Sequence, residues 1–214
     1  MHHHWPTSIT AAALLALAPP TSAHAQISLG VLAGGSLANI SGQLATGSKS
    51  TPTFLVGGTV TVDAKGFAMQ SGIIFTRKGF ETDPIEGVTP KNTFDYLQVP
   101  LVVRIGMPVG SKGRLYIGAG PSIGVKVGCR LSGTSDGISF STNCDDLSTD
   151  EGGIELKKTE FSGIGEAGLE FGKLSIGVRA DLGLSNIYEA SPGSLALPAD
   201  IKTKTISAVV ALRF

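Results

Sequence analysis

Apolar and polar side chains alternate with a period of two along most of the chain. In the segment 114–127 the odd positions hold Leu, Ile, Ala, Pro, Ile, Val and Val, and the even positions hold Arg, Tyr, Gly, Gly, Ser, Gly and Lys. The same separation of two faces runs through 174–184 and 206–214. Such alternation predicts β-strands with one apolar and one polar face.

Other segments alternate less regularly but fit the same description. They are Ile27–Leu37, Thr53–Val62, Phe67–Arg77, Tyr96–Met107 and Phe161–Phe171. Together the segments predict eight strands, each about ten residues long or slightly longer, which is the length that crosses a bilayer at a tilt.

The predicted connections are short and long in turn. The short ones cover 63–66, 108–112 and 172–173, and the long ones cover roughly 38–52, 78–95, 128–160 and 186–204. This order predicts an even-stranded up-and-down meander whose two ends differ. In outer-membrane barrels the short turns face the periplasm, so both termini are expected there.

Composition helps to decide which face is inside. The chain has 29 Gly, only 16% charged residues and a formal net charge of zero, so nucleic acid is not an expected partner. The polar face consists mainly of Gly, Ser and Thr with isolated charges, which suits a narrow lumen. The continuous apolar face suits lipid, where an outward charge at mid-bilayer costs about 2–4 kcal/mol.

These observations predict an all-β fold, an eight-stranded antiparallel up-and-down transmembrane β-barrel. Phe67, Phe171 and Phe214 fall on its apolar face beside the short turns, like an aromatic girdle. The alternative is a soluble lipocalin-like barrel, in which the apolar face points inward.

The N-terminus has the features of an export signal. The apolar run Ile9–Ala18 is followed by Pro19-Pro20 and by Ala23-His24-Ala25, which predicts a cleaved signal peptide over 1–25 and a barrel domain over 26–214. His2–His4 stand where Lys or Arg is usual. The apolar run is too short to cross a bilayer as a helix.

Three short motifs carry a family resemblance. They are Tyr96-Leu97-Gln98-Val99-Pro100-Leu101, Gly118-Ala119-Gly120-Pro121 and Leu212-Arg213-Phe214. The mature chain resembles the PorT-like, OmpX-sized outer-membrane β-barrel family, often labelled porin family proteins. The resemblance implies a bacterial outer-membrane location and no particular reaction. It also implies that Phe214 is the signal read by the barrel-assembly machinery.

Charged residues on the polar face are predicted to meet in the lumen. If Gly172-Lys173 forms a two-residue hairpin, Glu166 lies opposite Arg179 and Glu170 lies opposite Ser175. We expect a mid-lumen cluster of Glu166, Arg179 and Asp181. A lower cluster around Glu170 is expected to include Arg104, Arg114 and Arg213. Paired charges that fill the lumen are the favoured interpretation, and a gated path for small ions is the alternative.

The longest predicted loop, 128–160, contains Cys129 and Cys144. In an exported chain these residues are expected to form a disulfide, and closing about 15 residues stabilises by about 3 kcal/mol. The loop also holds Asp136, Asp145, Asp146, Asp150 and Glu151 without an ordered cation-ligand spacing. A loop of this length is the best candidate for contact with a partner.

Two further motifs have structural interpretations. Gly163, Gly165 and Gly168 form a G-x-G-x-x-G, but the strand alternation continues through it and no helix N-terminus follows, so a dinucleotide site is not expected. Pro100 and Pro121 each remove a ladder donor within a strand, which predicts a bulge or an irregularity between neighbouring strands.

The sequence therefore predicts an integral outer-membrane barrel with a filled lumen. It is expected to act through its extracellular loops in surface recognition, adhesion or envelope structure. The expected partners are outer-membrane lipid, the assembly machinery and an external protein or surface ligand. No enzymatic activity, metal or cofactor is expected. The alternatives are a narrow porin-like channel for small ions or solutes and the soluble carrier.

Overall fold

The structure is a computed structural model that describes residues 26–42, 47–64, 66–84, 88–135, 138–144, 154–190 and 201–214. The predicted signal peptide and the five acidic residues of the longest loop lie outside these ranges. The described strands are β1 (Gln26–Gly42), β2 (Ser48–Ala64), β3 (Phe67–Thr82), β4 (Thr89–Val109), β5 (Gly113–Ser135), β6 (Ile138–Asn143), β7 (Ile154–Leu156), β8 (Thr159–Phe171), β9 (Leu174–Gly183), β10 (Tyr188–Ala190) and β11 (Ile201–Arg213).

The sheet closes on itself. Within the described chain, eight strands form an antiparallel ring in the order β4-β3-β2-β1-β11-β9-β8-β5, and β4 also pairs with β5. The first and last strands meet along their length, from Gly30↔Arg213 to Gly42↔Ile201. Closure pairs the edge strands with each other, and the predicted fold class is confirmed.

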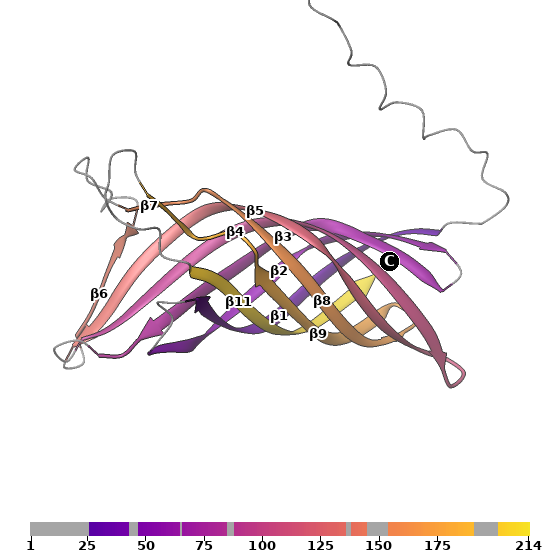
Figure 1. The fold of residues 1–214 in the computed structure, drawn as a ribbon. Coiled ribbons are helices and arrows are strands. Elements are labelled where there is room, and N and C mark those ends of the chain that lie inside the picture. The colour runs from indigo at the N-terminus through magenta and orange to yellow at the C-terminus, as the bar shows by residue number, and fades with distance from the viewer. Residues whose placement is uncertain are drawn as a thin grey trace, which may run out of the picture.

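The two ends of the barrel differ as the connection lengths predict. The tight turns contain Gly66, Gly110 and Gly172, each with a positive φ that favours glycine. Both ends of the described chain lie at this short-turn end, and the β6 hairpin extends from the opposite, loop end (Figure 1). No helix in the described ranges is long and apolar enough to span a membrane.

The strands extend further toward the loop end than the sequence predicts. The expected connections 38–52 and 78–95 are wrong in extent, because β1 continues to Gly42 and β4 begins at Thr89. Beyond the apolar band the outward positions become polar, as at Asn39 and Ser41, while inward positions such as Ile40 are apolar. The backbone ladder continues there without the outward apolar residues that mark a lipid-facing strand.

Pro100 and Pro121 do not change the strand register. The pairing of β4 with β5 has the same register at Pro100↔Ser122 and at Val103↔Ala119. Register shifts occur instead between Ser50 and Leu55 in β2 and at Asp95–Tyr96 in β4. The predicted bulge at the prolines is therefore wrong, whereas the predicted irregularity is found as a local gap in the pairing, because the pairs between Pro100↔Ser122 and Val103↔Ala119 are missing.

The outer wall of the barrel is apolar. Large hydrophobic side chains point outward along the strands, with exposed fractions of 63% for Ile73, 60% for Ile117 and 57% for Val178. Phe67, Phe171 and Phe214 are exposed near the short-turn end, as expected. A soluble carrier needs the opposite arrangement, so that alternative is wrong.

Candidate functional site in the barrel lumen

The layer of charge nearest the loop end surrounds Lys78 of β3, which is 1% exposed. Its Nζ lies 3.0 Å from Glu160 Oε1 of β8 and 2.8 Å from Asp181 Oδ1 of β9. Gln98 donates to Asp181 Oδ2 at 3.0 Å, and the Thr203 hydroxyl donates to Glu160. One ammonium group thus lies between two buried carboxylates, an arrangement that is stable only when each charge is paired and hydrogen-bonded.

The middle layer is organised around Glu166 of β8. Arg104 Nε of β4 donates to Glu166 Oε1, and Arg179 Nη1 of β9 lies 3.8 Å from Glu166 Oε2. Arg104 also donates to Gln70 Oε1 at 2.6 Å, and its guanidinium lies 4.6 Å from the centroid of the Tyr116 ring. Because β4 and β8 are separated by β5, the contact between Arg104 and Glu166 joins non-neighbouring strands.

The layer nearest the short turns alternates two carboxylates with two guanidinium groups. Asp63 lies 3.2 Å from Arg114 and 3.1 Å from Arg213, and Glu170 lies 3.6 Å from Arg114 and 3.2 Å from Arg213. These four residues help to line a cavity of about 600 Å³ at this mouth. The three layers together hold five basic and five acidic side chains, so their charges balance.

Inward glycines provide the space for the large polar side chains. A Cβ at Gly106 would collide with the Arg114 guanidinium, and one at Gly118 would lie 2.9 Å from Arg104 Cγ. Cβ atoms at Gly168 and Gly177 would lie 2.7 Å and 2.8 Å from the Tyr116 hydroxyl. Part of the high glycine content is therefore explained by side chains that fill a narrow barrel.

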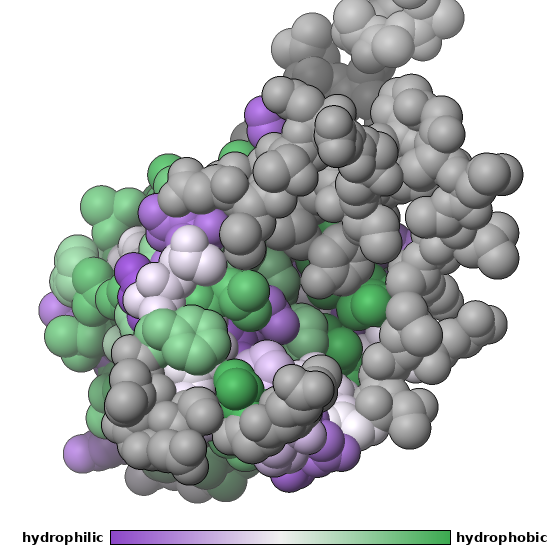
Figure 2. All heavy atoms as spheres, turned by 90° about the vertical axis from the view of Figure 1, so that its left-hand side faces the viewer, coloured by the Kyte–Doolittle hydropathy of each residue, from purple (hydrophilic) through white to green (hydrophobic). Residues whose placement is uncertain are grey.

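An apolar cluster, here called the outer plug, occupies the lumen at the loop end. It consists of Ile40, Phe80, Phe94, Tyr96, Cys129, Ile187 and Ile201. Phe80 is the next inward position after Lys78, whose Nζ lies 5.6 Å from the centroid of the Tyr96 ring. The outer plug therefore separates the buried charges from this mouth. Figure 2, which faces the loop end, shows hydrophobic residues in the middle of it.

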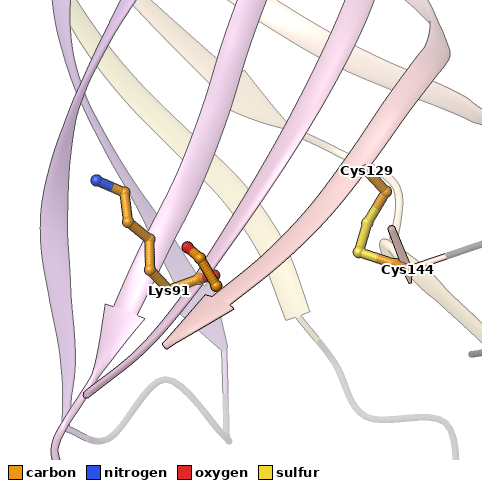
Figure 3. The surroundings of a disulfide bond; sticks show 4 residues. Lys91, Cys129 and Cys144 are labelled. Atoms are coloured by element: carbon orange, nitrogen blue, oxygen red, sulfur yellow. A yellow bond between two sulfur atoms is a disulfide. The ribbon is translucent and has the colours of Figure 1, made fainter. Parts of the chain in front are cut away.

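The predicted disulfide joins Cys129 to Cys144 (Figure 3). Cys129 does not lie in a loop, as the sequence suggested, but within β5, where it is buried in the outer plug. Cys144 follows β6 and packs against the same cluster. The bond therefore fixes the end of β6 to β5 at the base of the hairpin.

The structure divides the expected lumen cluster between two layers. Glu166 and Arg179 lie together in the middle layer, whereas Asp181 pairs with Lys78 in the layer above. Sequence reasoning missed Lys78 and Glu160 because both fell in segments predicted as loops. Both could have been found by extending the inward-facing alternate positions of the strands. Lys78 follows Ile74 and Thr76 at a spacing of two, and Glu160 precedes Ser162 and Ile164 at the same spacing. These six residues are buried.

A match to a family model agrees with this architecture. The model of the outer membrane protein beta-barrel domain family matches residues 19–189. Neisserial surface protein A is similar at 13% identity over 88% of this chain and 99% of its own, with a TM-score of 0.46. OprG from Pseudomonas aeruginosa is similar at 13% identity over 90% and 98%, with a TM-score of 0.48. Ail from Yersinia pestis is similar at 15% identity over 87% and 98%, with a TM-score of 0.40.

No curated protein matches the chain. The chain is an integral β-barrel protein of the bacterial outer membrane. It belongs to the outer membrane protein beta-barrel domain family, whose model covers most of its length. The short turns then lie in the periplasm and the long connections lie outside the cell.

Proposed function

We propose that this protein is a closed, non-conducting barrel that acts through its extracellular side, in surface recognition, adhesion or envelope structure. The observation that carries the proposal is the outer plug above the buried Lys78 layer. An eight-stranded barrel is only wide enough to be filled by side chains, and apolar atoms across its outer mouth give ions no hydrated path. The lumen residues Glu166, Arg179, Asp181, Glu170, Arg104, Arg114 and Arg213 have a structural role in this proposal.

The disulfide-linked β5–β6 hairpin lies on the extracellular side. β6 pairs with β5 from Arg130↔Asn143 to Ser135↔Ile138, beyond the part of β5 that pairs with β8. The Cys129–Cys144 bond lies at the base of this hairpin. A hairpin fixed at its base is pre-organised, which lowers the entropy cost of binding a partner. We infer that the external partner contacts this hairpin and the connection that follows it.

Other features support a family subgroup, an assembly signal and the absence of catalytic turnover. The motif Tyr96–Leu101 supports membership of the PorT-like subgroup. An outward Phe214 at the chain end supports recognition by the barrel-assembly machinery. The engagement of each lumen carboxylate by a basic side chain supports the absence of catalytic turnover.

N-terminal sequencing tests the predicted removal of the signal peptide. The sequence of the protein isolated from outer membranes is expected to begin at Gln26, which would establish removal of 1–25.

Single-channel recording tests the closed barrel. Purified protein in a planar bilayer is expected to produce no conductance steps. A variant with Ile40→Ala, Phe94→Ala and Tyr96→Ala, which removes much of the outer plug, is the matched control for sensitivity. Reproducible steps from the unmodified protein would overturn the proposal in favour of a narrow channel.

Site-specific photo-crosslinking on whole cells tests the extracellular role. A photoreactive residue in place of Asp146 or Asp150, in the connection after the hairpin, is expected to form adducts with a surface component. The same residue in place of Ser111, in the turn between β4 and β5, is the periplasmic control. Adducts from Ser111 with none from the outer positions would contradict the proposal.

A further inference from the structure

Three basic side chains point outward at the outer border of the apolar wall. In β3 the outward positions run from Ile73, which is 63% exposed, through Phe75 to Arg77. Lys91 of β4 and Arg130 of β5 lie further toward the loop end on the same outer face. The basic groups therefore begin where the lipid-facing hydrophobic residues end.

These side chains surround a cavity of about 670 Å³ on the outer wall. The register places them in successive outward rows: Arg77 opposite Asp95, Thr93 opposite Arg130, and Lys91 opposite Ser132. Phe54 and Val127, which are 42% and 52% exposed, line the same cavity from the apolar wall. Its lining thus combines hydrophobic and basic side chains.

The charges of the cavity are not balanced. Arg77 donates to both Asp95 oxygens at 2.7 Å and 2.8 Å, and its guanidinium also lies 5.3 Å from the Phe54 ring centroid. Lys91 Nζ lies 3.4 Å from Glu81 Oε1, and its side chain points away from the disulfide (Figure 3). Arg130 is exposed and has no ion pair within the described part of the chain. One guanidinium remains available to an anion.

We propose that this cavity binds the phosphate group of an outer-leaflet lipid, with Arg130 as the main ligand and Lys91 beside it. Guanidinium groups bind phosphate oxygens through paired, charge-assisted hydrogen bonds. A lipid headgroup fits better than a free anion because the cavity lies on the lipid-facing wall. Acyl chains extend along the apolar residues below it, and Phe54 and Val127 contact the first part of those chains.

Binding of lipid A, a phosphorylated lipid, to the purified mature barrel in detergent tests this site. Arg130→Gln is expected to weaken binding about tenfold, the effect of losing a charge-assisted hydrogen bond. Lys204→Gln is the matched control, because Lys204 is an exposed outward residue of β11 that does not line the cavity. This control is expected to change the affinity less than twofold. Slower gel migration after boiling verifies that each variant is folded.

Further binding measurements distinguish a lipid phosphate from free inorganic phosphate. Phosphatidylcholine is expected to bind both variants and the unmodified barrel equally, because its own cation compensates its phosphate. Inorganic phosphate at millimolar concentration is expected not to displace lipid A. Displacement by inorganic phosphate would overturn the lipid assignment. Equal losses of lipid A affinity in Arg130→Gln and Lys204→Gln, or no loss in either, would overturn the site itself.

Discussion

At the scale of single residues, Lys78 is the side chain on which the lumen depends most. Replacing it with Met leaves Glu160 and Asp181 buried without their shared cation. Breaking a buried pair in this way costs about 3–5 kcal/mol, and Lys78→Met is expected to lower the free energy of unfolding by that amount. Urea titration of the barrel in lipid vesicles measures it.

Two comparisons make this prediction specific. Lys49 pairs with Asp83 at 3.0 Å, but both side chains are more than half exposed, so Lys49→Met is expected to change stability little. Adding Glu160→Gln and Asp181→Asn to Lys78→Met removes the unpaired charges and is expected to recover part of the loss. Equal effects of the two lysine substitutions would contradict a charge-dependent lumen.

Glycine positions give a second residue-scale prediction. A Cβ at Gly120 would overlap the Leu101 carbonyl oxygen, whereas a Cβ at Gly35 meets no atom within 4 Å. Gly120→Ala is therefore expected to destabilise the barrel by about 1–3 kcal/mol through overpacking, and Gly35→Ala is expected to have no such cost. The fraction that migrates as the compact form without boiling, followed against temperature, distinguishes them. Identical curves would show that backbone spacing adjusts freely.

At the scale of elements, the sequence predicts strand centres better than strand ends. Alternation identified all the barrel strands because lipid requires apolar residues on one face and a tight lumen requires small or paired polar residues on the other. Outside the bilayer, lipid no longer requires apolar residues on the outer face. There β4 continues through Thr93, Asn92 and Lys91 with polar residues on both faces. Lys78 and Glu160 were missed for this reason.

The disulfide-linked hairpin provides the element-scale prediction. Reduction of Cys129–Cys144 releases a loop of 15 residues and is expected to lower the free energy of unfolding by about 3 kcal/mol. A double Cys129→Ala, Cys144→Ala variant is the control and should not respond to reductant. Denaturant titrations with and without dithiothreitol measure both proteins. An unchanged midpoint for the reduced natural barrel would show that β5 and β6 stay docked without the bond.

At the scale of the whole molecule, hairpin register alone does not predict the lumen network. The register of β8 and β9 gives Glu166 opposite Arg179, as the sequence indicated. The stronger partner of Glu166 is Arg104, from a strand that is not its neighbour. Such contacts depend on barrel diameter and strand tilt, which no local pattern specifies. Pairwise register therefore predicts which residues are inward, and closure of the ring decides which of them meet.

Closure also determines where the molecule tolerates charge on its outside. Val178 lies in the middle of β9 and is 57% exposed, and Leu184, just beyond the outer end of that strand, is 65% exposed. Val178→Arg is expected to cost about 2–4 kcal/mol, and Leu184→Arg about 0–1 kcal/mol, because the cost of an outward charge depends on depth in the bilayer. Folding free energies in lipid vesicles measure both. The two costs should converge when the same variants are folded in short-chain detergent micelles, which adapt their thickness to the protein. A cost at Leu184 as large as that at Val178 would place the bilayer further toward the loop end than the apolar wall indicates.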